Sequence, residues 1–237
     1  FFLWRTYNEI VNKEKSFVNS TWNPRSKKFL FLTGKPEKQH RIGLLYDLEK
    51  HGLTDNCVSS LFVNKLNQSI CQQMLGIDNN EFQRFVDKFN SSPDFVGLPN
   101  TTSVHYGGIP YDVGLFQTKF RLISETHINS ESPWITEKTW ITILNHQPFL
   151  IAGDVRSCQK LASFGYKTFD GFIDETYDTL PTHERLQSII ESIRKVDNIS
   201  DKIGWYKEME SIIKFNHDTL INKLFVLPEA FQEVIKY

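Results

Sequence analysis

The stretch "KFRLISETHINSESPWITEKTWITILNHQPFLIAG", residues 119–153, contains two apolar runs separated by a polar segment. The runs over 119–124 and 148–153 have the length and composition of buried strands. Residues 137–145 between them are expected to form a helix, with Thr136 as its N-cap. A strand, a helix and a strand in this order predict two parallel strands joined by a right-handed crossover.

The same alternation of short apolar runs and helical patterns extends in both directions from this stretch. One example is "NNEFQRFVDKFN", in which Phe82, Phe85, Val86 and Phe89 fall on one helical face. Further strands are expected over 27–34, 56–62 and 166–169. Further helices are expected over 3–18, 35–52, 64–75, 80–90 and 155–164, and through most of the chain after 180.

This order predicts an α/β fold, a Rossmann-like parallel sheet with flanking helices and a helical C-terminal extension. The expected boundaries are an N-terminal helical segment over 1–27, a Rossmann-like domain over 28–180 and the extension over 181–237. Parallel sheets of this kind bind ligands beyond the carboxyl ends of their strands. The segments after Leu32, Ser124 and Gly153 are therefore candidates, as is the Gly- and Pro-rich loop over 91–116.

Composition narrows the classes of partner. The formal net charge of the 237 residues is −1, which gives no electrostatic case for nucleic acid or an anionic membrane. No apolar run approaches the roughly 20 residues that cross a bilayer. Three cysteines without CxxC spacing suggest reduced thiols, and hence a cytoplasmic location. No Asp-x-Asp motif follows a strand, so neither a divalent metal nor another cofactor is indicated.

A basic turn follows the first expected strand. It contains Lys35, Lys38, His40 and Arg41 just before a helix. A helix start favours anions through its free amides and dipole, and Arg or Lys strengthens that preference. The alternative interpretation is a solvated basic turn, because neither GxGxxG nor a P-loop is present.

Acidic residues follow the third expected strand and open the next helix. Glu125 at the strand end could accept hydrogen bonds from ligand hydroxyls, or it could bond the amides of the next turn. Glu137 suits the first turn of a helix without any ligand. Lys138 opposes the helix dipole at that position, which favours an anion nearby. Because the strand ends share one edge, these groups together match the phosphates and hydroxyls of a nucleotide-sugar.

The segment from Phe120 to Gly153 also resembles the donor-binding motif of the alpha-1,3-fucosyltransferase family. That motif reads approximately Phe-x-Leu-x-Phe-Glu-Asn, a short loop, Tyr-x-Thr-Glu-Lys, a helix and an apolar Pro-Val-Val-x-Gly strand. "FLFLTGKPEKQHRIGLLYDLEKHGL" is similar to the upstream strand, turn and helix. The turn is closer to phage and giant-virus glycosyltransferase-like proteins, and "GYKTFDGFIDETYD" (165–178) is similar to their following segment.

The resemblance, over about 28–180, implies the nucleotide-binding half of a GT-B glycosyltransferase. Arg41 and Lys35 would contact the diphosphate, Glu137 and Lys138 would engage the nucleotide-sugar, and Glu125 would line the pocket. The full set of expected donor-binding residues is Lys35, His40, Arg41, Ser124, Glu125, Thr136, Glu137 and Lys138.

Departures from the family limit what carries over. Ser124-Glu125-Thr126 replaces Phe-Glu-Asn, so fucose and guanine specificity do not follow. The chain has room for one Rossmann-like domain, so a second domain or subunit could supply the acceptor site. No residue matches the family's general base; His105, Asp112, His40 and His127 are the only candidates for it.

The sequence therefore predicts transfer of a sugar from a nucleoside diphosphate to a sugar or other hydroxyl acceptor. Two alternatives remain open. One is a nucleotide-sugar-binding module that lacks a base and acts with a partner. The other is a viral transferase that modifies a nucleic-acid base, which the near-neutral charge disfavours.

Overall fold

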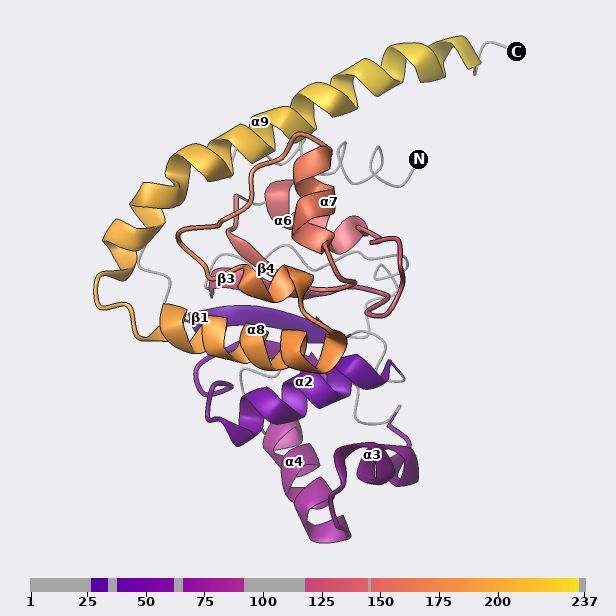
Figure 1. Ribbon diagram of the computed structural model, residues 1–237, viewed down its shortest axis with the longest axis vertical. Helices are drawn as coiled ribbons and strands as arrows, with labels where there is room; N and C mark the ends of the chain where they lie inside the picture. The colour runs from indigo at the N-terminus through magenta and orange to yellow at the C-terminus, as the bar shows by residue number, and fades with distance from the viewer. Residues whose placement is uncertain (1–26, 34–37, 62–65, 92–117, 145, 235–237) are drawn as a thin grey trace.

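A computed structural model describes residues 27–33, 38–61, 66–91, 118–144 and 146–234 (Figure 1). Several sequence predictions lie outside these residues. They are the helix over 3–18, nearly all of the loop over 91–116, and the individual residues Lys35, His105 and Asp112.

The described residues form one four-stranded, all-parallel sheet with the order β2-β1-β3-β4. Its strands are β1 (Lys27–Thr33), β2 (Val58–Leu61), β3 (Thr118–Ser124) and β4 (Phe149–Ala152). Leu30 of β1 lies opposite both Val58 of β2 and Arg121 of β3, and Ser124 lies opposite Ala152 of β4. The predicted Rossmann-like α/β class and its four main strands are confirmed.

Helices flank this sheet and extend beyond it. They are α2 (Gln39–Lys50), α3 (Gln68–Leu75), α4 (Asn79–Ser91), α6 (Glu137–Leu144), α7 (Ser157–Ser163), the short 3-10 helix η2 (Thr176–Thr179), α8 (Thr182–Asp197) and α9 (Lys202–Val234). From β1 to β2 the chain moves toward one edge strand of the sheet, and from β3 to β4 it moves toward the other edge strand. Right-handed crossovers therefore place α2 and α6 on opposite faces. Accordingly α2 contacts α8, whereas α6 contacts β3 and α9 (Figure 1).

A single hydrophobic core joins the sheet to its helices. Phe29 of β1 and Phe120 of β3 place their ring centroids 5.6 Å apart, and both side chains are buried. The predicted apolar face of α4 is buried as expected. The same core includes Ile193 of α8 and Met209 of α9, so the C-terminal helices pack on the α/β layer.

The strand expected over 166–169 does not form. Only an isolated bridge between Asp170 and Ile173 occurs there. The backbone amide of Phe169 donates to the Glu175 carboxylate at 2.8 Å, and that of Lys167 donates to the Asn216 side chain at 2.8 Å. Side chains therefore occupy the amides that a neighbouring strand would have bound.

The helix expected over 155–164 begins later than predicted, at Ser157. Arg156 adopts a left-handed conformation with φ 65° and ends the preceding turn. The carboxylate of Asp178, twenty residues away, accepts bonds from the amides of Cys158 at 2.9 Å and Gln159 at 3.1 Å. A cap supplied from so far along the chain has no local sequence signal. Within the described part of the chain, no helix is long and apolar enough to span a membrane.

Candidate functional site

The start of α2 is tied to the end of β3 at the carboxyl edge of the sheet. Arg41 Nη2 donates to the Glu125 carbonyl at 3.1 Å, and His40 Nε2 donates to the same oxygen at 3.1 Å. Arg41 is buried and His40 is partly buried. Two segments that are 84 residues apart thus meet at one peptide group.

The Glu125 side chain extends this junction to the start of α6. Its carboxylate is fully buried and accepts bonds from the Thr136 amide at 3.0 Å, the Thr139 hydroxyl at 2.9 Å and the Thr136 hydroxyl. Thr136 immediately precedes α6, as predicted, but its hydroxyl is committed to Glu125. Buried carboxylates need such donors, because burying an ionised group without partners costs far more than the roughly 2–7 kcal/mol of an unbonded neutral polar group.

Lys138 and Glu137 are the charged members of this group that reach solvent. Lys138 Nζ lies 3.4 Å from Glu137 Oε1, 3.7 Å from Glu125 Oε2 and 3.0 Å from the Thr136 hydroxyl. Its side chain is 18% exposed and that of Glu137 is 36% exposed. A cation in the first turn of α6 therefore lies beside two carboxylates at a solvent-accessible helix start.

The loop between β3 and α6 is held by two residues that the sequence did not single out. The buried carboxylate of Asp154 accepts bonds from the amides of Ser130 at 2.6 Å and Trp134 at 3.3 Å. Buried Arg185 of α8 donates from Nη2 to the Ile128 carbonyl at 2.6 Å. The loop leading to Thr136 is thus fixed along its length, although the Trp134 ring is 65% exposed. Only the strand-end position of Asp154 gave a signal.

Gly153 permits the close approach of β4 to this loop. A Cβ at this position would lie 2.8 Å from Ser157 Oγ and 3.3 Å from Glu125 Cβ. Distances that short require the neighbours to shift, so the glycine that ends the "PFLIAG" run is needed for close packing around Glu125.

His40 lies in a positive and partly dry environment. Burial lowers the pKa of His40 from 6.5 to about 4, opposed by its bond to the Glu125 carbonyl and reinforced by the neighbouring charges of Arg41 and Lys38. His40 is therefore neutral near pH 7. Because Nε2 donates to a carbonyl, only Nδ1 remains as a potential acceptor.

Arg121, in the middle of β3, is a second buried cation that the sequence did not single out. Its side chain is 2% exposed, and burial lowers its pKa to about 10 despite the nearby charges of Glu125 and Glu137. A charged residue inside a strand that reads "KFRLIS" is the signal that could have identified it.

The described members of the predicted donor-binding set gather at this edge, from the start of α2, the end of β3 and the start of α6. Ser124 is buried at the last position of β3, and its hydroxyl has no hydrogen-bond partner among the described residues. His127, a candidate base, is exposed. In the part of the chain that the structure describes, no group of three His, Cys, Asp or Glu side chains could hold a metal ion.

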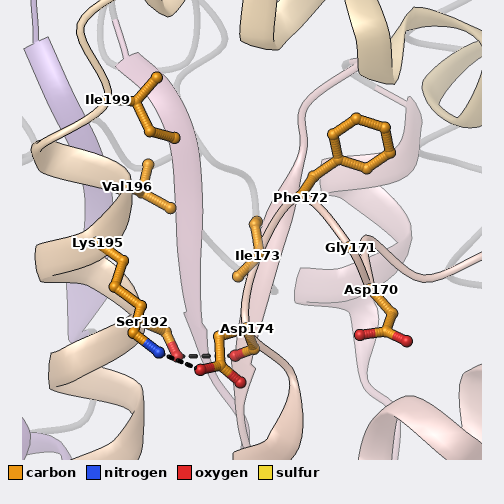
Figure 2. Close-up of a pocket in the computed structure, with 9 residues that line it drawn as sticks. All are labelled: Asp170, Gly171, Phe172, Ile173, Asp174, Ser192, Lys195, Val196 and Ile199. Atoms are coloured by element: carbon orange, nitrogen blue, oxygen red, sulfur yellow. Dashed lines mark hydrogen bonds and ion pairs between the residues drawn. The ribbon is translucent and has the colours of Figure 1, made fainter.

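A separate cavity of about 340 Å³ lies at the other edge of the sheet, between the second half of α8 and residues 170–174 (Figure 2). Asp197 at the end of α8 pairs with Lys28 at the start of β1, at 2.8 Å, so this part of α8 lies at the amino edge. Asp174 and Lys195 form an ion pair, and the Ser192 hydroxyl donates to the Asp174 carbonyl at 2.7 Å (Figure 2). These polar groups already satisfy one another, and none belongs to the predicted set.

The chain matches no protein-family model, no curated protein and no solved structure. The fucosyltransferase resemblance therefore rests on its motifs alone.

Proposed function

We propose that the chain is a glycosyltransferase that binds a nucleoside-diphosphate sugar at the carboxyl edge of its sheet and transfers the sugar to a hydroxyl acceptor. The observation that carries the proposal is the junction at Glu125. One residue joins the basic start of α2, through its carbonyl, to the start of α6 that carries Glu137 and Lys138, through its carboxylate.

The charges at this junction favour an anionic ligand. Among the described residues, Lys38, Arg41, Arg121 and Lys138 contribute four positive charges, against the three carboxylates of Glu125, Glu137 and Asp154. An anion beside the solvent-accessible Lys138 would offset this excess of positive charge. The first turn of α6 adds a favourable helix dipole, although the amides of Thr136 and Thr139 are already bonded.

The geometry refines the roles that the resemblance implies. Lys138 and Glu137 reach solvent and are the groups proposed to touch the donor. Arg41, His40 and Glu125 are bonded to one another and are proposed to hold the two helix starts in place. During transfer, negative charge develops on the departing diphosphate, and Lys138 with the α6 amides would stabilise it.

The finer parts of the proposal follow the family resemblance. The sheet would be the donor half of a GT-B enzyme, related to fucosyltransferase-like proteins of phages and giant viruses and acting in the cytoplasm. The acceptor site would come from a second domain or subunit. The donor would bind without a divalent metal.

A second candidate is a nucleotide-sugar-binding module that has no catalytic base of its own. One observation favours it. In the described residues around the junction, the Glu125 carboxylate is occupied by three donors and His40 is partly buried and bonded through Nε2. Neither group is in a position to take a proton from an acceptor.

Calorimetry with a panel of nucleotide-sugars, run beside an assay of diphosphate release, tests both candidates. The Lys138→Met variant should weaken binding about tenfold, equivalent to about 1.4 kcal/mol, while the fold is retained. Lys195→Met, at the amino edge, is the matched control and should bind as the wild type does. Binding without turnover would favour the module, whereas equal affinity of the Lys138 variant and the wild type would remove the site.

A further inference from the structure

Arg121 contains the least compensated charge in the described part of the chain. No described residue forms a hydrogen bond with its Nε or Nη1, although the side chain is 2% exposed. A guanidinium has five N–H donors, and burying them unpaired is costly. Arg185, equally buried, instead donates to the carbonyls of Leu180 and Ile128 and to the Thr182 hydroxyl.

Arg121 lies on the same side of the sheet as the Glu125 junction. Side chains alternate along a strand, so residues 121, 123 and 125 share a face. That face is the one covered by α6, because the Glu125 carboxylate bonds Thr136 and Thr139. The carboxylates of Glu125 and Glu137 favour the charged form of Arg121.

Neither carboxylate forms a hydrogen bond with Nε or Nη1 of Arg121. Glu125 already accepts bonds from three donors, and Glu137 lies beside Lys138 at 3.4 Å. The missing partner must therefore come from outside the described side chains. A carboxylate fits a guanidinium, because its two oxygens match the planar fork of N–H groups.

We propose that Arg121 binds a carboxylate on the donor sugar, so that the preferred donor is a nucleoside-diphosphate uronic acid. This inference rests on the proposed function. Lys138 meets the diphosphate at the open start of α6, and Arg121 lies further along β3, toward the interior. The sugar enters first between β3 and α6, with its C6 carboxylate directed toward the guanidinium.

Matched pairs of donors test the inference, because each pair differs only at C6. UDP-glucose is compared with UDP-glucuronate, and GDP-mannose with GDP-mannuronate, by calorimetry at fixed ionic strength. Within the pair whose base is accepted, the acid should bind at least about tenfold more tightly than the neutral sugar. Equal affinities within that pair would overturn the role of Arg121 and leave the proposed function intact. Binding of neither pair would remove both.

The Arg121→Met variant distinguishes a role of Arg121 in recognising the donor from a role in stabilising the fold. It should lose the preference for the acid, so that the acid and the neutral sugar bind with equal affinity. Its melting temperature should stay the same or rise, since replacing a buried unpaired charge by an apolar side chain of similar volume is often neutral or stabilising. A large fall in melting temperature would assign Arg121 a structural role and contradict the proposal. Arg121→Lys, which keeps the charge but loses the fork, should retain part of the preference, and complete retention would contradict the bidentate contact.

Discussion

Charged side chains at the carboxyl edge of the sheet differ from those at its amino edge in how deeply they are buried. At the carboxyl edge, Arg41 and Glu125 are buried, and their bonds join segments from α2 to α6, while Arg121 is buried in the middle of β3. At the amino edge, the pair of Asp174 and Lys195 is local and Lys195 is 66% exposed. Exposed pairs form at little cost and contribute about 0–1 kcal/mol, whereas buried charges must be compensated.

This difference in the burial of charge is the reason for proposing the ligand site at the carboxyl edge. A protein of marginal stability retains buried charges where they are satisfied by one another or by a ligand. The polar groups Asp174, Lys195 and Ser192 of the amino-edge cavity bond one another. The carboxyl edge instead has an excess of positive charge, and Nε and Nη1 of Arg121 have no hydrogen-bond partner among the described residues. Cavity volume alone would favour the amino edge, away from the proposed site.

Glu125→Ala should give the largest effect of any single change at either edge. It removes the acceptor for three bonds and leaves Arg121 with less counter-charge, so the free energy of unfolding should fall by about 3–5 kcal/mol. Urea denaturation measures it. Glu125→Gln retains one acceptor oxygen and should lose less. A loss below about 1 kcal/mol for the Ala variant would mean that the junction does not hold the edge together.

The pH dependence of His40 should come next in size. Its folded pKa of about 4 lies below the unfolded value of 6.5. Between these values the unfolded chain binds a proton that the folded chain does not, so stability is lost as the pH falls from 6.5 toward 4. At 1.36 kcal/mol for each pKa unit, the loss is at most about 3 kcal/mol.

The difference in unfolding free energy between wild type and His40→Gln isolates this contribution, because other carboxyl groups titrate in both proteins. The free energy of unfolding of the wild type should decrease relative to that of the variant as the pH falls from 7 to 4. A difference that is constant over that range would contradict the buried, neutral state of His40.

Asp154→Ala should loosen the loop between β3 and α6. It removes the acceptor for the amides of Ser130 and Trp134, at a cost of about 2 kcal/mol. Hydrogen exchange over residues 126–135 should accelerate, while exchange in α8 stays as in the wild type. Asp154→Asn, which keeps one acceptor oxygen, should give exchange rates in this loop between those of the wild type and of Asp154→Ala. Unchanged exchange in the loop would show that other contacts hold it.

Lys195→Ala at the amino edge should have the smallest effect, below about 0.5 kcal/mol, because its pair with Asp174 is exposed. Raising the salt concentration should remove most of that difference. A loss comparable with that of Glu125→Ala would mean that burial does not determine how much the charged groups at each edge contribute to the free energy of unfolding.

The sequence predicted the layered fold because apolar periodicity and helix signals are local properties. Phe82, Phe85, Val86 and Phe89 could be assigned to a buried face from their spacing alone. The strand over 166–169 was wrong because Asn216 and Glu175 bind its amides, and these partners lie up to 49 residues away.

The site could be located by topology but not described in detail. Strand-end logic predicted that Arg41 and Glu125 share one edge, and the hydrogen bond between them agrees with it. Burial could not be read from the sequence, so Arg41 was expected to face a ligand directly. Asp154 and Arg185 act through contacts between distant segments, which a pattern of neighbours along the chain does not encode.

A crystal structure with a bound nucleoside diphosphate tests the central claim most directly. The account predicts the diphosphate at the start of α6, within hydrogen-bond distance of Lys138 Nζ, with the hydrogen bonds of Glu125 unchanged. A diphosphate beside Lys195 in the amino-edge cavity, or at any place remote from Lys138, would contradict it.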